Sequence, residues 1–153
     1  MVTYNVYRDG SKIASGLTDK SYTDDSLTPN TQYQYQVSAE NSAGESELSD
    51  PVTVKTKYSE PQSIEVSPKT NNLEVGTERK LTATVLPDTA KQTVAWAVDK
   101  DNVATVDENG KVTAIAAGTA TVTVKSTEND TKATTTVKVT EPTPEEPTPE
   151  EGA

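Results

Sequence analysis

Apolar and polar residues alternate along most of the chain, with the two-residue period of β-strands. In the run YQYQVSAEN, Tyr33, Tyr35 and Val37 fall on one face and the glutamines between them on the other, as in a half-buried strand. No stretch has helical periodicity long enough to matter, so the pattern predicts an all-β protein. Similar alternation recurs at Tyr4/Val6, Val52/Val54, Ile64/Val66, Leu73/Val75, Leu81/Ala83/Val85, Val94/Trp96/Val98, Val103/Val106, Val112/Ala114, Ala120/Val122/Val124 and Val137/Val139.

Turn-forming residues separate these strands about every ten residues, a spacing typical of antiparallel β-sandwiches. Asp9-Gly10 follows the first strand. Asn109-Gly110 lies between two apolar strands and predicts a type I′ hairpin, in which both central residues have positive φ. Gly118 stands directly before TATVTV and predicts a further turn.

Breaks in the alternation divide the chain into modules. Polar residues and Pro61 in KYSEPQS separate two alternating blocks, so we predict a module over residues 1–57, a linker over 58–63 and a second module over 64–140. Residues 141–153 repeat PTPEE in tandem. Proline removes backbone donors and the glutamates repel one another, so this tail is predicted to be a disordered spacer. A docking peptide is the alternative.

Composition removes several classes of function. The chain has no Cys and no His, which excludes thiolate ligands and removes the commonest general base. The net charge is −10, and five of the acidic residues lie in the tail. Because no basic stripe is present, nucleic-acid binding is disfavoured. No apolar run reaches membrane-spanning length and no signal peptide follows Met1, so membrane insertion is not expected.

The acidic stretch DKDNVATVDENG is the strongest candidate for a metal site in the sequence. An EF-hand loop starting at Asp99 would need a ligand at its fifth position, Gly at its sixth and Glu at its twelfth. Those positions hold Val103, Ala104 and Gly110, so we predict a solvated loop and no metal or cofactor. A weak carboxylate site is the alternative. Without a histidine or a G-x-S-x-G motif, no catalytic residue is assigned and the chain is not expected to be an enzyme.

Residues 1–57 contain four motifs in the order YNVYRDG, LTPNTQYQYQV, AENSAGES and PVTVKT. They resemble, in the same order, strand C, the E–F corner with strand F, the F–G loop and the last strand of a fibronectin type III domain. The resemblance implies that Tyr33 is the corner tyrosine, bonded through its hydroxyl to the backbone upstream. It also implies that strands A and B are missing and that strand E alone remains of their sheet. Either the chain is a fragment, or another chain supplies strands by β-augmentation.

Residues 60–140 contain two long motifs, IEVSPKTNNLEVGTERKLTATVLPDTA and VAWAVDKDNVATVDENGKVTAIAAGTATVTVKS. They resemble the opening strands and the core motif of the bacterial Ig-like domain of group 2, which occurs in Gram-positive surface proteins, intimin-like adhesins and phage structural proteins. The resemblance implies a buried Trp96. The whole chain is thus expected to be two tandem Ig-like β-sandwich modules, the first incomplete, followed by the tail.

Tandem Ig-like modules without a catalytic site usually serve as spacers between other domains, display them on a surface, or mediate adhesion. The preferred hypothesis is a decoration module of a phage structural protein, displayed on the virion surface. Its expected partners are host cell-wall glycans, bound weakly, or other virion proteins. The alternative is a spacer or adhesion module of a secreted Gram-positive surface protein or glycoside hydrolase, which would place the chain outside the cell.

Overall fold

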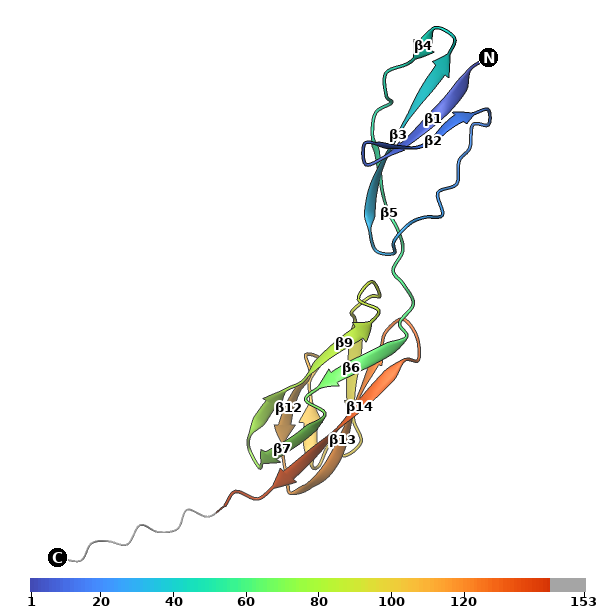
Figure 1. Cartoon of the computed structure of the whole chain (residues 1–153). Helices are drawn as coiled ribbons and strands as arrows, with labels where there is room; N and C mark the ends of the chain where they lie inside the picture. The colour runs from blue at the N-terminus through green and yellow to red at the C-terminus, as the bar shows by residue number, and fades with distance from the viewer. Residues whose placement is uncertain (144–153) are drawn as a thin grey trace, which may run out of the picture. The chain divides into compact units, whose positions relative to one another are not determined.

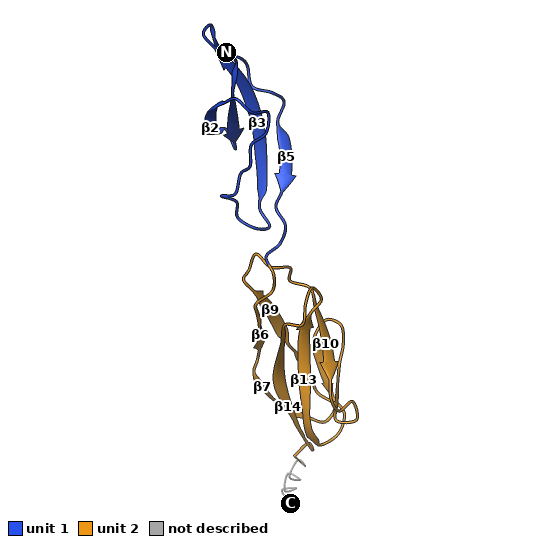
Figure 2. Cartoon of the chain, turned by 90° about the vertical axis from the view of Figure 1, so that its right-hand side faces the viewer, with its two compact units in different colours: residues 1–59 blue, residues 60–153 orange. Residues whose placement is uncertain are grey.

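The computed structural model describes residues 1–143, and its compact units are Met1–Ser59 and a second that begins at Glu60 (Figure 2). All regular elements in this described part are β-strands (Figure 1), as the alternation predicts. From position 144 onward, the predicted tail lies outside the described residues. Between residues 1 and 143 there is also no helix of the length and apolarity that crossing a membrane requires.

The first unit is a single antiparallel sheet. Its strands lie in the order β2–β1–β3–β4. The fifth strand, β5, also pairs with β3: β5 pairs with the first half of β3 and β4 with its last two residues. A two-residue turn joins β1 to β2, with φ of 50° at Asp9 and 79° at Gly10, the geometry of a type I′ hairpin. The five strands are β1 Thr3–Arg8, β2 Ser11–Leu17, β3 Gln32–Asn41, β4 Gly44–Glu45 and β5 Val52–Lys55.

Residues 18–31 connect β2 to β3 without forming a strand. The expectation that strand E remains from a second sheet is therefore wrong. An extended segment becomes a strand only when a neighbour satisfies its backbone groups. Among residues 1–143, no main-chain partner bonds to the backbone of residues 18–27, so this part of the connection runs over the sheet unpaired.

The second unit contains three sheets among its described residues. Their strand orders are β10–β13–β14–β7, β11–β12–β8 and β6–β9. All pairings are antiparallel except that of β7 with β14, which is parallel and differs from the predicted arrangement. The strands are β6 Ser63–Ser67, β7 Thr70–Glu74, β8 Glu78–Lys80, β9 Thr82–Leu86, β10 Val94–Val98, β11 Ala104–Val106, β12 Lys111–Ala114, β13 Gly118–Ser126 and β14 Lys132–Thr140.

One predicted strand of the second unit, around Leu81, is split in two. β8 pairs with β12 whereas β9 pairs with β6, so the chain passes from one sheet to another at Leu81. The side chain of Leu81 is 1% exposed. Alternation continues through the crossing because both sheets turn their apolar faces toward the same interior.

The core of the second unit consists of two neighbouring clusters of aliphatic side chains. Val112 and Val137 belong to the first cluster and Val85 and Val124 to the second, and all four are completely buried. Trp96 packs against both clusters with a half-buried side chain. The tryptophan expected in the core therefore lies at the junction of the clusters, with part of its ring at the surface.

Candidate functional site

One face of the sheet in the first unit is apolar, and no second sheet formed by residues 1–143 covers it. Residues opposite one another in an antiparallel pair point to the same face. The register places Val6 opposite Val37. It likewise places Tyr35 opposite Val52. Val37 and Val52 are 47% and 60% exposed, although the alternation predicts that Val37 points into a core. This apolar face therefore resembles one side of a β-sandwich core, but it is exposed to solvent.

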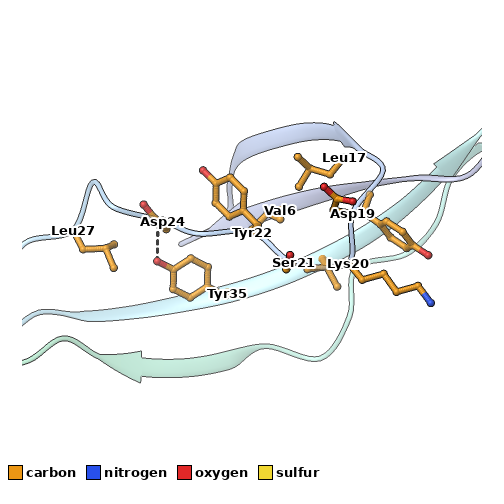
Figure 3. A pocket seen from close by; sticks show the side chains of 11 residues that line it. Val6, Leu17, Asp19, Lys20, Ser21, Tyr22, Asp24, Leu27 and Tyr35 are labelled. Carbon is orange, nitrogen blue, oxygen red and sulfur yellow. Dashed lines mark hydrogen bonds between the residues drawn. The ribbon is translucent and has the colours of Figure 1, made fainter.

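A groove of about 720 Å³ lies between the apolar face and the connection that follows β2 (Figure 3). Val6, Tyr35 and Val37 line it from the sheet. Tyr22 and Leu27 line it from the connection. This volume is in the range of small-molecule pockets, but the lining consists mainly of apolar groups that an ordinary domain would bury.

Asp24 ties the connection to the sheet. Its Oδ2 accepts a hydrogen bond of 2.7 Å from the Tyr35 hydroxyl, drawn as a dashed line in Figure 3. Arg8 Nη1 donates to both carboxylate oxygens, at 2.9 and 3.1 Å. The Tyr35 hydroxyl and the Arg8 guanidinium lower the pKa of Asp24, whereas burial beside this carboxylate raises the pKa of Tyr35 to about 12. Asp24 is therefore an ionised anchor near neutral pH.

Tyr33 lies where the connection enters β3. Its hydroxyl oxygen accepts a hydrogen bond of 2.9 Å from the backbone N–H of Thr28, which is the upstream backbone contact that the resemblance implied. The same bond lowers the pKa of Tyr33. Arg8 lies over the Tyr33 ring, 5.4 Å from its centroid. Tyr33 thus fixes the end of the connection and does not line the groove.

The opposite face of the same sheet carries a polar network around two buried side chains, Asn5 and Ser38. Asn5 is fully buried, and its Nδ2 donates to Glu45 Oε1 at 2.8 Å. Glu45 also accepts hydrogen bonds from the hydroxyls of Ser38 and Tyr7 and from Lys12 Nζ. These donors, Ser38 foremost, lower the pKa of Glu45 to about 2. Alternation does not predict this network, because it assigns each polar position of a half-buried strand to the solvent side.

The turn at Asn109-Gly110 differs from the predicted type I′ hairpin. Gly110 has a φ of 77°, but Asn109 is not among the residues with positive φ. Asp107 Oδ1 instead accepts the backbone N–H groups of Asn109 and Lys111, at 2.9 and 2.8 Å. Because this carboxylate holds the loop from inside, only Gly110 needs the left-handed conformation.

Two glycines that the sequence singles out lie against large side chains. A Cβ atom on Gly110 would lie 2.8 Å from both Cε2 and Cζ2 of Trp96. A Cβ atom on Gly118, at the start of β13, would lie 2.9 Å from a methyl carbon of Val103. Both positions therefore need a residue without a side chain, and Gly110 and Trp96 together form a structural unit of the core.

The acidic stretch of the second unit uses its carboxylates locally. Asp99 Oδ1 accepts the backbone N–H of Thr121 at 2.7 Å, and this bond lowers the pKa of Asp99. The pKa of Asp107 is lowered by its backbone hydrogen bonds. Within residues 1–143, no three acidic side chains come together as a metal site would require. These residues close turns and bridge strands.

Two glycoside hydrolases of bifidobacteria contain stretches similar to this chain. The lacto-N-biosidase of Bifidobacterium bifidum is 53% identical over 70 residues, which is 46% of this chain and 6% of the enzyme. The 3-O-alpha-D-galactosyl-alpha-L-arabinofuranosidase of Bifidobacterium longum subsp. longum is 46% identical over 56 residues, 36% of this chain and 5% of the enzyme. The similar stretches are thus small parts of much longer proteins.

Two solved structures illustrate the fold that this chain shares with known proteins. The Drosophila N-cadherin EC1-4 structure has a TM-score of 0.53 at 18% identity, and the match spans 93% of this chain and 41% of the N-cadherin chain. The S-layer protein rSbsC(31-844) has a TM-score of 0.52 at 16% identity, and the match spans 92% of this chain and 20% of the S-layer protein chain. At such low identity the likeness concerns the Ig-like β-fold alone.

Family models account for both units. The fibronectin type III domain matches residues 2–55, in agreement with the resemblance of the strand and corner motifs. The bacterial Ig-like domain (group 2) matches residues 61–140, which is more than half of the chain. The core arrangement around Trp96 and the strand order of the second unit lie within this match. The chain therefore belongs to the bacterial Ig-like domain (group 2) family, with a fibronectin type III segment preceding that domain.

Proposed function

We propose that this chain is a non-catalytic accessory segment of a larger extracellular protein of a Gram-positive bacterium, of the glycoside hydrolase or surface-protein type. One observation carries the proposal. The stretch shared with the lacto-N-biosidase is 53% identical yet makes up 6% of that enzyme. Such a share suits an accessory domain far better than a catalytic one, and domains of both matched families typically have no catalytic role.

The carboxylates support an accessory role as well. Most glycoside hydrolases use two acidic residues, one of which is held protonated by a raised pKa. In the described part of the chain, every carboxyl group with a resolved shift has its pKa lowered by its partners. Asp24 and Glu45 show the reason, since each accepts several hydrogen bonds that stabilise its ionised form.

The comparisons favour the alternative that the sequence left open over the virion hypothesis. Both reported relatives carry names of glycoside hydrolases, and neither is a virion protein. Under the proposal, the chain is extracellular and holds functional parts of a larger protein apart or attaches them to a surface. Any contact with glycans would be weak and would gain strength from repetition.

Turnover and glycan retention test this proposal. The chain is incubated at high concentration with chromogenic β-galactosides, lacto-N-biosides and α-galactosides, and product release is compared with that of a heat-unfolded sample. We expect no difference, and a rate that disappears on unfolding would overturn the proposal. Affinity electrophoresis through gels containing cell-wall polysaccharide or mucin then separates two forms of the role: retention indicates adhesion, and unaltered migration indicates a spacer.

A further inference from the structure

We propose that residues 18–27 form a strap that opens as one unit from the sheet of the first unit, with Asp24 as the clasp that keeps it closed. Such an opening would be a conformational change within the first unit, separate from the accessory role.

The attachments of the strap converge on one carboxylate. Residues 18–27 have no main-chain to main-chain hydrogen bond with any other described residue. The side chain of Asp24 binds Arg8 and Tyr35 of the sheet. Arg8 Nη1 also donates a longer bond of 3.4 Å to the carbonyl of Ser26, and that bond depends on the position in which Asp24 holds the guanidinium. Loss of one anion would therefore loosen the whole strap.

The two ends of the strap are fixed independently of Asp24. At its start, Leu17 pairs with Tyr4 in the ladder between β2 and β1. Beyond its other end, the N–H of Thr28 donates to the Tyr33 hydroxyl at 2.9 Å, and its carbonyl accepts the Thr56 hydroxyl at 2.6 Å. These attachments belong to the sheet and its corner. They define hinge points at which opening stops, so the sheet need not unfold with the strap.

The strap lies over the apolar face of the sheet, but its own apolar side chains are only partly buried. Tyr22 at the lip of the groove remains 43% exposed, and Leu27 is only half-buried. The hydrophobic contribution to closure is therefore small, because it scales with the apolar area removed from water. The charged hydrogen bonds of Asp24 are left as the dominant attachment, since bonds to charged groups are stronger than neutral ones. Opening would uncover Tyr35 and increase the exposure of Val37, which is already 47% exposed.

Limited trypsin digestion of the full chain tests the strap. Lys20 lies within it, whereas Lys12 lies in β2, so cleavage after Lys20 reports the strap and cleavage after Lys12 reports the sheet. Cleavage of a transiently opened segment follows the population of the open form when reclosing is fast. Asp24→Asn removes the charge of the clasp. Asp25→Asn makes the same change at the neighbouring residue and serves as the control.

Asp24→Asn is expected to raise the rate of cleavage after Lys20 about tenfold, the effect of losing roughly one charged hydrogen bond near the surface. Cleavage after Lys12 should stay within about twofold, and Asp25→Asn should alter neither rate. Tyr35→Phe, which keeps the Arg8 contact, should give a smaller rise. A fluorescent dye that binds apolar surface should bind Asp24→Asn more strongly than the control.

Two results would overturn the strap. If cleavage after Lys20 and Lys12 rises together in Asp24→Asn, the carboxylate stabilises the whole sheet and the strap does not open alone. If neither rate changes, Asp24 does not hold the strap. Both readouts are independent of turnover and glycan retention, so the proposed function can fail while the strap stands.

Discussion

Replacement of Gly110 by alanine would place a methyl group where the Trp96 ring already lies. The added Cβ would be 2.8 Å from two ring carbons and 3.0 Å from the carbonyl oxygen of Leu81, so the ring or the backbone must move. Overpacking of this kind costs about 1–3 kcal/mol. The φ of 77° at Gly110 adds about 1–2 kcal/mol, since a side chain clashes with the backbone in the left-handed region. We expect a total loss of about 2–5 kcal/mol.

Urea denaturation followed by fluorescence measures this loss directly, because Trp96 is the only tryptophan in the chain. The midpoint should fall while the slope of the transition stays constant. Gly76→Ala is the matched control. Gly76 has a φ of 86°, but no atom of the described residues lies within 4 Å of a Cβ placed there, so Gly76→Ala should lose only the conformational part, about 1–2 kcal/mol. Equal losses in both variants would refute the close packing of Gly110 on Trp96.

Three further predictions concern the two units. Trp96→Ala should destabilise the second unit by about 3 kcal/mol, the low end for truncation of a tryptophan because the ring is half-buried. Circular dichroism at increasing temperature measures this, and wild-type melting would contradict it. Tyr33→Phe removes the acceptor of the Thr28 N–H and should cost the first unit about 1 kcal/mol, measured by urea titration of the tyrosine signal. The Glu45 network should make the first unit acid-sensitive. Because the pKa of Glu45 is lowered from 4.5 to about 2, its stabilisation is complete above pH 4.5 and declines as the pH falls toward 2. An acid titration followed by circular dichroism should show that decline, and Glu45→Gln should remove this component.

Alternation in the sequence predicts the strands of the second unit because that unit buries the apolar residues that recur at every second position. The apolar residues of β6, β12, β13 and β14 lie in the core as expected. The split at Leu81 could not be predicted, since a two-residue period shows which side a residue faces and not which strand it pairs with. For the same reason, the parallel partner of β7 has no signature in the sequence.

The first unit shows where a local pattern stops being informative. Val37 has the sequence context of a core residue and is nearly half exposed, whereas Ser38 beside it is 3% exposed. Burial depends on what covers each face. Among the described residues, a polar network covers part of one face of this sheet and the strap covers part of the apolar face. The groove and the Asp24 clasp are formed by side chains that are distant in sequence, so no local motif predicts them. The Tyr33 contact could be predicted because the motif LTPNTQYQYQV, which contains both partners, resembles the E–F corner of a fibronectin type III domain.

The parallel pairing of β7 with β14 has a mechanical consequence. Residues 70–74 lie near the start of the second unit and pair one to one with residues 136–140 at its end. When tension pulls Thr70 at the start of β7 and Thr140 at the end of β14 apart, the two strands are drawn in opposite directions along their own axes. The ladder is then loaded in shear, so its hydrogen bonds share the force and must yield together. An antiparallel pair pulled from one end would instead unzip a bond at a time. A protein held under flow or between two attachments would gain resistance to extension from this pair.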